Sequence, residues 1–375
     1  LFGAGMLNHL HSQKMPGKKA LLVISNGKST KINGYLKRTE EQLQKAGVEF
    51  TIFDQIEANP LKSTVMAGGN AAQTNGCDFI VALGGGSVID ASKAIAVMAT
   101  NDGDYWDYIP SGSGKGKIMT NVPLPIIAIT TTAGTGSETD PGCVITNETT
   151  HEKTGFVHPA LFPVLAIVDP ELMLSVPPKF SAYQGFDALF HSIEAYVSNG
   201  ANLMSDMYAL TAIENVSLNL PKTVKNGNDI EARTKVAFGN TLSGSVMCVG
   251  RCNSEHSLEH AMSAYRQELP HGAGLIMISK AYFTHLIKQH VCDDRFIKMA
   301  KVMGMKNATE PMDFIAALTK LQEDCDLKMS DYGITPDEFE KFAINAKDTM
   351  GFLFSCDRIP LSNEDCINIY AAFYK

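Results

Sequence analysis

Two pairs of polar residues with helical spacing, and one histidine in a predicted turn, carry the side chains best suited to chemistry. Asp187 and His191 lie four residues apart, which places both on one face of a helix, and His256 and His260 repeat this spacing. His271 lies between a proline and a glycine, in a predicted turn. An aspartate and three histidines make a mixed oxygen and nitrogen ligand set for a borderline divalent metal.

Each of these features also has a simpler explanation. An aspartate four residues before a histidine is more often a surface hydrogen bond, and a histidine before glycine is more often only a turn residue. Both pairs, however, lie in otherwise apolar helical segments, where an unpartnered polar group costs free energy. The sequence therefore favours a metal site.

Two cysteines offer a rival ligand set. Cys248 and Cys252 precede His256 and His260 at the same four-residue step, which resembles a Cys–Cys–His–His zinc site. If all four lie on one helix they span about 18 Å and cannot bind one ion. We therefore interpret the cysteines as packing residues, or as thiols near the site that make it sensitive to oxidation.

Two glycine- and hydroxyl-rich turns are candidates for binding a dinucleotide. The first turn consists of Gly84, Gly85, Gly86 and Ser87, and the second, Thr130–Ser137, follows a predicted strand. Asp90 and Lys93 lie in the helix after the first turn, where they could orient a ribose or a nicotinamide amide. Glycines let a phosphate approach the backbone, and a helix N-terminus offers unpaired N–H groups. Either turn alone could serve a steric or capping purpose, but two turns at the ends of parallel strands favour a shared ligand. The G-x-G-x-x-G fingerprint is absent, so this is not the standard Rossmann turn.

The elements that position these residues change character along the chain. Short apolar runs typical of buried strands occur at Ala20–Ile24, Phe50–Phe53, Phe79–Leu83, Ile126–Ile129 and Ala166–Val168. Helical stretches at Thr39–Ala46 and Val88–Ala99 lie between them, and this alternation predicts a parallel sheet covered on both faces. From residue 181 onward the apolar spacing is helical. We predict an α/β dinucleotide-binding domain over residues 1–180 and an all-α metal-binding domain over residues 181–375.

Composition limits the remaining possibilities. The 375 residues are 45% hydrophobic and 19% charged, with a net charge of −8, which argues against binding nucleic acid or an anionic membrane. No apolar run approaches the length of a membrane helix, and the eight cysteines have no small-scaffold spacing, so we expect a cytoplasmic protein with free thiols. Because the chain opens at Leu1 rather than Met, we expect residues to precede it.

The motifs resemble those of the iron-containing (group III) alcohol dehydrogenases, nearest to the butanol dehydrogenase-like members. The resemblance runs along essentially the whole chain and is carried by Leu1–Gly5, Gly84–Lys93, Thr130–Glu138, Val168–Pro170, Gly185–His191 and the segment from His256 to Gly272. It implies an N-terminal domain similar to that of dehydroquinate synthase and a strand before Leu1. The chain departs from relatives at Glu255 and Glu259, which replace small residues, at Phe190, and by one extra residue between His260 and His271.

The resemblance also assigns roles to individual residues. It implies that the metal, Fe²⁺ with Zn²⁺ as the alternative, is held by Asp187, His191, His256 and His271. It leaves His260 beside the substrate, where we expect a proton relay. The cofactor contacts that we expect are Ser25, Asn59, Gly84, Gly85, Gly86, Ser87, Asp90, Thr131, Thr132, Thr135 and Lys153.

The expected reaction is hydride transfer between a nicotinamide cofactor and a small primary alcohol or aldehyde, in a homodimer. A bound ion with a net charge of about +1 would lower the pKa of an alcohol. No acid follows the first strand at Ser25, and Lys28 lies just beyond, so we predict NADP(H) over NAD(H). The alternatives are a glycerol-type polyol dehydrogenase and a lyase resembling dehydroquinate synthase. The lyase would need a more basic pocket than this helical half offers.

Overall fold

The N-terminal unit contains the predicted parallel sheet. The computed structural model describes residues 1–327 and 332–374, which form two compact units, Leu1–Ser175 and Val176–Lys375. The sheet has the strand order β2-β1-β3-β4-β7, all parallel. Its strands are β1 (Lys19–Ser25), β2 (Glu49–Ile56), β3 (Phe79–Gly84), β4 (Ile126–Thr130) and β7 (Leu165–Val168). Each predicted strand lies within one of these, so the predicted sheet is confirmed.

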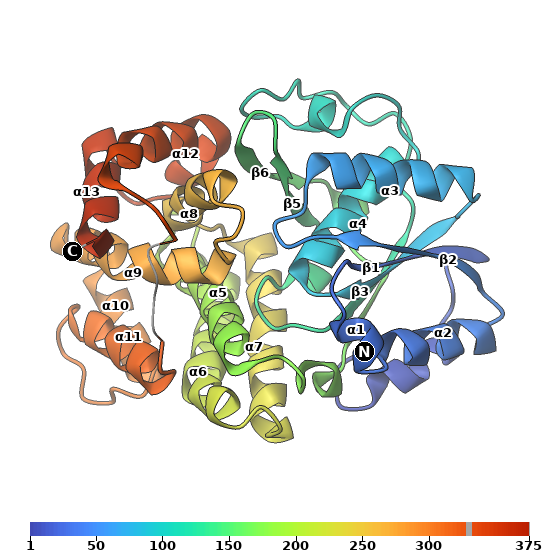
Figure 1. The fold of residues 1–375 in the computed structure, drawn as a ribbon. Helices are drawn as coiled ribbons and strands as arrows, with labels where there is room; N and C mark the ends of the chain where they lie inside the picture. The colour runs from blue at the N-terminus through green and yellow to red at the C-terminus, as the bar shows by residue number, and fades with distance from the viewer. Residues whose placement is uncertain (328–331, 375) are drawn as a thin grey trace. The chain divides into compact units, whose positions relative to one another are not determined.

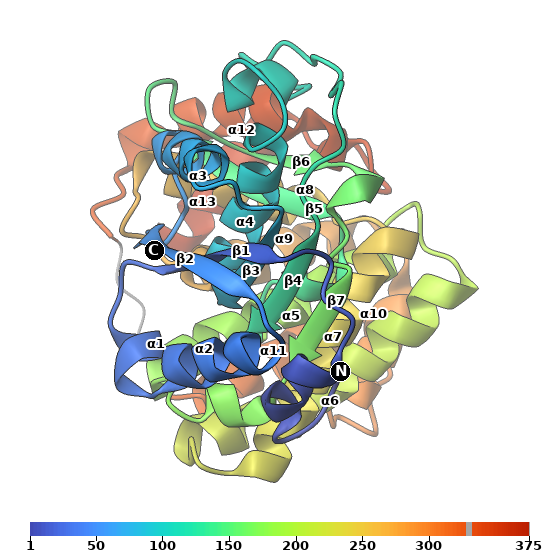
Figure 2. The same ribbon diagram turned by 90° about the vertical axis from the view of Figure 1, so that its right-hand side faces the viewer.

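Helices cover both faces of this sheet (Figures 1 and 2). They are α1 (Ser29–Ile32), α2 (Tyr35–Lys45), α3 (Lys62–Thr74) and α4 (Gly86–Met98). Along β1 the side chains alternate, so that Leu21 packs into the core beneath α3 and α4 while Leu22 packs into the core beneath α2. The central strands β1, β3 and β4 are therefore buried on both sides, as their nearly continuous apolar sequences require, whereas the edge strand β2 is mostly exposed or half-buried.

Two features of the N-terminal unit were not predicted. One is α3, and the other is an antiparallel hairpin of β5 (Gly142–Asn147) and β6 (Glu152–Val157). The hairpin packs on α4, the helix that follows the first glycine turn. It therefore lies where it can support the second turn, Thr130–Ser137, which directly precedes it.

The C-terminal unit is helical throughout its described part, as predicted. Its helices are α5 (Pro178–Val197), α6 (Leu203–Lys225), α7 (Ile230–Val249), α8 (Ser254–Tyr265), α9 (His271–Lys288), α10 (Asp293–Val302), α11 (Asp313–Asp324), α12 (Phe339–Phe354) and α13 (Asn363–Tyr374). Helix α5 packs against α6, α7 and α9, and α8 packs against α9 and α12. The compact units divide between Ser175 and Val176, whereas the sequence prediction placed the boundary at residue 180. Among the described residues no helix is long and apolar enough to cross a membrane.

Candidate metal centre and cofactor turns

The helix α5 contributes the first two predicted ligands. Asp187 and His191 lie one turn apart on its buried face, with exposed fractions of 4% and 7%. The Nδ1 atom of His191 is 3.4 Å from Oδ1 of Asp187. Helix α5 is fixed by close packing at Gly185, where a Cβ atom would come within 2.3 Å of Leu220 on α6. The spacing of the pair predicted this arrangement.

Two further helices direct histidines at the same carboxylate oxygen. Oδ1 of Asp187 is 3.6 Å from Nε2 of His256 on α8 and 3.5 Å from Nε2 of His271, the first residue of α9. Ligands about 2.1 Å from an ion lie about 3.4 Å apart at the corners of a tetrahedron. The distances around Oδ1 therefore suit a small divalent cation.

Hydrogen bonding gives a second test of this fit. Oδ1 of Asp187, Nδ1 of His191 and Nε2 of His256 are all buried, and none has a hydrogen-bond partner. Buried polar atoms without partners are rare and costly. Three of them converging in one place is the arrangement expected where these atoms bind a cation.

The cluster has a substructure that the sequence did not predict. Ligand atoms of Asp187, His256 and His271 lie within 4.8 Å of one another, and so do those of His191, His256 and Cys252. His256 belongs to both groups. A third group, of Glu259, His260 and His271, meets the same limit. The structure therefore brings together all four predicted ligands and places Cys252, Glu259 and His260 next to them.

This cysteine corrects an assumption made from the sequence. Cys248, Cys252 and the two histidines of the H-x-x-x-H pair do not lie on one helix, because α7 ends at Val249 and α8 begins at Ser254. Cys248 is exposed at the end of α7, and Cys252 lies in the connecting segment. The argument from a continuous helix about 18 Å long therefore does not apply to Cys252.

Buried carboxylates orient two of the histidines. Nδ1 of His256 hydrogen-bonds Oε1 of Glu194, and Nδ1 of His271 hydrogen-bonds Oε2 of Glu259. Glu255 contacts Glu194 and is fully buried. A carboxylate behind a ligating imidazole fixes the tautomer and direction of the ring. From the sequence, Glu259 was noted as a departure from relatives and as a possible partner of His260, not of His271. Glu194 was missed, although it lies one helical turn after His191.

The electrostatics of the centre stabilise positive charge. Burial opposes a proton on His256, but the Glu194 carboxylate and Asp187 outweigh it and raise the pKa of His256 to about 10. Burial and the neighbouring His256 lower the pKa of His191 to about 3. Burial alone would raise the pKa of Asp187, but the surrounding histidines hold it below its usual range. The carboxylates thus favour a cation at the middle of the cluster.

His260 lies against His271, and the ligand atoms of His260, His271 and Glu259 lie within 4.8 Å of one another. Its ring centroid is 5.0 Å from that of His271 and 6.4 Å from that of His256. Its Nδ1 atom is 2.7 Å from Sδ of Met350, a residue where α12 departs from helical geometry with φ −130° and ψ 36°. Because the ring centroids of His256 and His271 are 5.3 Å apart, these distances do not separate His260 from the four predicted ligands, and its role as a proton relay stays a prediction.

In the N-terminal unit the two candidate cofactor turns contact each other. A Cβ atom on Gly85 would come within 2.8 Å of the Thr132 side chain, and one on Gly86 within 2.2 Å of Thr135. The amide of Thr131 donates to the carbonyl of Gly84 at 2.9 Å. These positions require glycine because the side chains of Thr132 and Thr135 pack directly against them. The two turns therefore form one continuous surface, with Ser87 in the first turn of α4.

Three of the other expected cofactor residues, Asn59, Asp90 and Lys153, have protein partners. Lys153 on β6 donates to Oδ1 of Asn59 at 3.0 Å, and Asn59 has a positive φ of 53°. Asp90 accepts from the Ser137 hydroxyl at 2.6 Å and from the Val144 amide at 2.9 Å. Both oxygens of Asp90 thus hold the second turn and the hairpin, a contribution that the sequence did not reveal.

A fully buried lysine completes this support. Nζ of Lys93 donates to the carbonyl oxygens of Ser137 and Gly142, to the Ser137 hydroxyl and to Asp140, at 2.6–3.2 Å. Lys93 has no exposed surface. Helix α4 is therefore bonded to the segment after the second turn by both Asp90 and Lys93.

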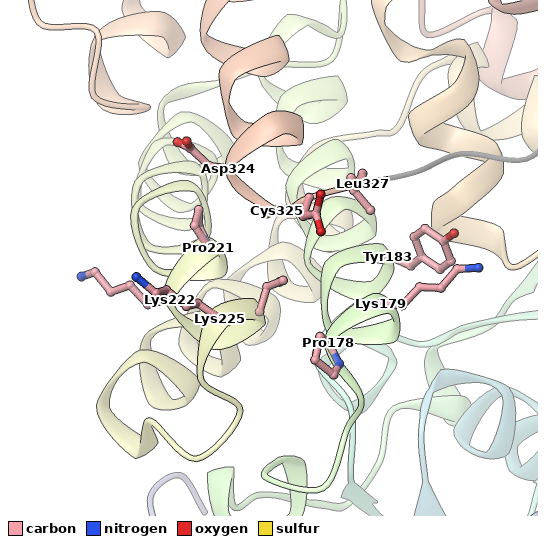
Figure 3. A pocket seen from close by; sticks show the side chains of 11 residues that line it. Pro178, Lys179, Tyr183, Pro221, Lys222, Lys225, Asp324, Cys325 and Leu327 are labelled. Carbon is pink, nitrogen blue, oxygen red and sulfur yellow. The ribbon is translucent and has the colours of Figure 1, made fainter.

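A separate hollow of about 730 Å³ opens in the C-terminal unit. Figure 3 shows that its walls come from the start of α5, the end of α6 and the end of α11, with Lys179, Tyr183, Lys222, Lys225 and Asp324 among them. None of the predicted ligands lines it. The candidate metal centre is defined by the side-chain cluster and not by this hollow.

Comparison with known proteins identifies the family. Residues 1–170 match the family model described as iron-containing alcohol dehydrogenase, and residues 181–374 match its C-terminal counterpart. The 1,3-propanediol dehydrogenase of Klebsiella pneumoniae is 33% identical over 88% of this chain and 85% of its own length.

Solved structures of similar fold belong to the same class of enzyme. An archaeal halo-thermophilic alcohol dehydrogenase from a Red Sea brine pool is 31% identical, covers 100% of this chain and 96% of its own, and superposes with a TM-score of 0.94. The NADH-dependent butanol dehydrogenase A of Thermotoga maritima is 26% identical, with a TM-score of 0.88 over 99% of this chain and 95% of its own. The chain therefore belongs to the iron-containing alcohol dehydrogenase family. It is an oxidoreductase of the alcohol dehydrogenase type.

Proposed function

We propose that this protein reversibly interconverts a small primary alcohol and its aldehyde, with a divalent ion bound by Asp187, His191, His256 and His271. The observation that carries the proposal is the buried Oδ1 of Asp187, which faces three imidazole nitrogens at 3.4–3.6 Å without a hydrogen-bond partner. When bound, the ion would supply positive charge that polarises the substrate oxygen.

The ion that we propose is Fe²⁺, with Zn²⁺ as the alternative. The family name and the mixed oxygen and nitrogen donors support iron. Intrinsic affinity favours zinc at such sites, so occupancy depends on metal supply and exposure to oxygen.

The chain's own residues would orient the ligands and move the proton. Glu194 and Glu259 hold the rings of His256 and His271. We assign His260 to proton transfer between the substrate oxygen and solvent. Because its Nδ1 lies against Sδ of Met350, Nε2 is the atom that we assign to this transfer.

The proposed cofactor is a nicotinamide dinucleotide on the two contacting turns, with Asn59, Lys153 and Ser25 completing the site. When bound, its nicotinamide accepts a hydride from the alcohol carbon or returns it to the aldehyde. We propose NADP(H) over NAD(H), because Ser25 ends β1 where an acid would repel a 2′-phosphate, and Lys28 beyond it is exposed. The nearby acid Asp54 is paired with Lys31 at 2.6 Å.

The solved Thermotoga relative is named as NADH-dependent, so this cofactor preference needs a direct test. The ratio of kcat/KM for NADPH and NADH measures it. A higher value with NADH would refute our reading of Ser25 and Lys28.

The names of the relatives support a short alcohol or diol as the substrate, since they include 1,3-propanediol and butanol dehydrogenases. We further propose that the enzyme is a cytoplasmic homodimer, which sedimentation and fractionation would test.

The decisive experiment compares two aspartate variants after anaerobic purification. Asp187→Asn should lose bound metal and activity with a panel of aldehydes, whereas Asp348→Asn, at an exposed position on α12, should keep both. Wild-type protein that binds metal and cofactor but reduces no aldehyde would overturn the proposal and favour a lyase resembling dehydroquinate synthase.

A further inference from the structure

Cys252 lies in a short break between two helices at the edge of the metal centre. Helix α7 ends at Val249 and α8 begins at Ser254, so residues 250–253 turn the chain. Packing on Gly250 keeps this turn tight, since a Cβ atom there would come within 3.1 Å of Ser205. The turn brings the thiol toward the imidazoles that α8 and α5 present.

The thiol lies within reach of two histidines with unsatisfied nitrogens. The ligand atoms of Cys252, His191 and His256 all lie within 4.8 Å of one another. Nδ1 of His191 and Nε2 of His256 are buried without a hydrogen-bond partner, and the two rings stack with centroids 4.2 Å apart. Imidazole nitrogen and cysteine thiolate are both established donors for zinc.

A single carboxylate links the cysteine segment to the ligand helix. Oε2 of Glu194 accepts from the amide of Asn253 at 2.6 Å, while its Oε1 bonds Nδ1 of His256. Glu194 is fully buried and one turn beyond His191 on α5. The residue after Cys252 and the ring of His256 are therefore positioned by the same side chain, which fixes the thiol relative to the ligands.

We propose that Cys252 supplies a thiolate ligand to the ion at this centre, together with His191 and His256. The inference deepens the proposed function, because it requires the metal that this function uses. Thiolate is a softer donor than carboxylate or imidazole, so it raises the affinity for zinc more than for ferrous iron. The cysteine therefore makes the metal selectivity of this chain depend on one residue outside the predicted ligand set.

The test uses Co²⁺ as a spectroscopic probe in the full-length protein. A thiolate bound to Co²⁺ gives a near-ultraviolet charge-transfer band, which nitrogen and oxygen ligands do not give. The band should be present in the wild type, absent in Cys252→Ser and unchanged in Cys248→Ser. Cys248 is the matched control because it lies only four residues earlier but is exposed.

A second measurement reports selectivity. In competition between equal concentrations of Zn²⁺ and Fe²⁺ without oxygen, the bound zinc-to-iron ratio should fall at least about 10-fold in Cys252→Ser. If Cys252→Ser does not fold, the test is instead made on the wild-type protein, by alkylating its cysteines and mapping the modified residues by mass spectrometry. Zinc should then protect Cys252 but not Cys248.

The outcomes separate this inference from the proposed function. No charge-transfer band in the wild type, or the same band and metal ratio in Cys252→Ser, would overturn the thiolate ligand while leaving the four-residue site intact. Retention of metal by Asp187→Asn would instead overturn the proposed function.

Discussion

The carboxylate behind His271 should control how tightly the centre holds its ion. Glu259 is fully buried, and its Oε2 accepts from Nδ1 of His271. Helix α9 packs directly against it, since a Cβ atom on Gly274 would lie 2.7 Å from its Cγ. The substitution Glu259→Gln keeps the shape of the side chain but removes the charge that makes the imidazole a better donor. Loss of such support costs about 10- to 100-fold in metal affinity, or about 1.4–2.8 kcal/mol.

The assay is competition for Zn²⁺ or Co²⁺ against a chromophoric chelator, with thermal unfolding of the metal-free proteins as a check on folding. Glu268→Gln is the control, because Glu268 is exposed in the turn between α8 and α9. We expect the metal affinity of Glu259→Gln to fall by that factor while Glu268→Gln matches the wild type. An affinity for Glu259→Gln within about twofold of the wild type would show that the carboxylate does not support the ligand.

Three further predictions test the turns and the residues around them. Gly86→Ala adds a Cβ atom within 2.2 Å of the second turn and should raise the Kd for cofactor about tenfold. Gly155→Ala is the control, because its Cβ atom would meet nothing closer than 3.9 Å and should leave the Kd unchanged. Equal Kd values for the two variants would contradict the close contact at Gly86. Burial raises the pKa of Asp90 from 3.8 to about 6, so the stability that this group contributes is full below pH 4 and is lost as the pH rises through 6. In denaturant titrations, the free energy of unfolding of Asp90→Asn minus that of the wild type should therefore increase by about 1–3 kcal/mol as the pH rises over that range. A difference that stays constant with pH would refute the raised pKa of Asp90. Met350→Leu removes the sulfur beside His260. It should lower kcat/KM about 2- to 10-fold and shift the pH profile of kcat/KM without changing the metal content. An unchanged pH profile would exclude this contact from proton transfer.

Strands β1, β3 and β4 were predictable because they are buried on both faces and read as uninterrupted apolar runs. The edge strand β2 is mostly exposed or half-buried, and only its short run Phe50–Phe53 marked it in the sequence. Helix α3 was missed because Gly68 and Gly69 weaken its helical pattern. Both glycines are required by packing, since Cβ atoms there would lie 2.4 Å from Ile95 and 2.6 Å from Met98. The β5–β6 hairpin was missed because its strands carry many polar residues, whose partners, such as Lys153 with Asn59, come from elsewhere in the chain.

The clustering of Asp187, His191, His256 and His271 was predictable from spacing together with family resemblance, but the carboxylates that support these side chains were not. Glu194 and Glu259 act through histidines on other helices, and no local pattern specifies which helices pack together. The position of Cys252 was predictable in part. Glycine commonly ends a helix and asparagine commonly starts one, as Gly250 and Asn253 do here. These two residues therefore predict two helices, where the four-residue spacing had suggested a single one.

The burial of Lys93 makes it a natural reporter of motion in the N-terminal unit. An amine-modifying reagent cannot reach its Nζ while four acceptors and the surrounding core enclose it. The rate at which Lys93 is labelled therefore measures how often the segment from Ser137 to Gly142 detaches from α4. A cofactor held by the adjoining turn would slow this labelling, so one lysine can report binding without any catalytic assay.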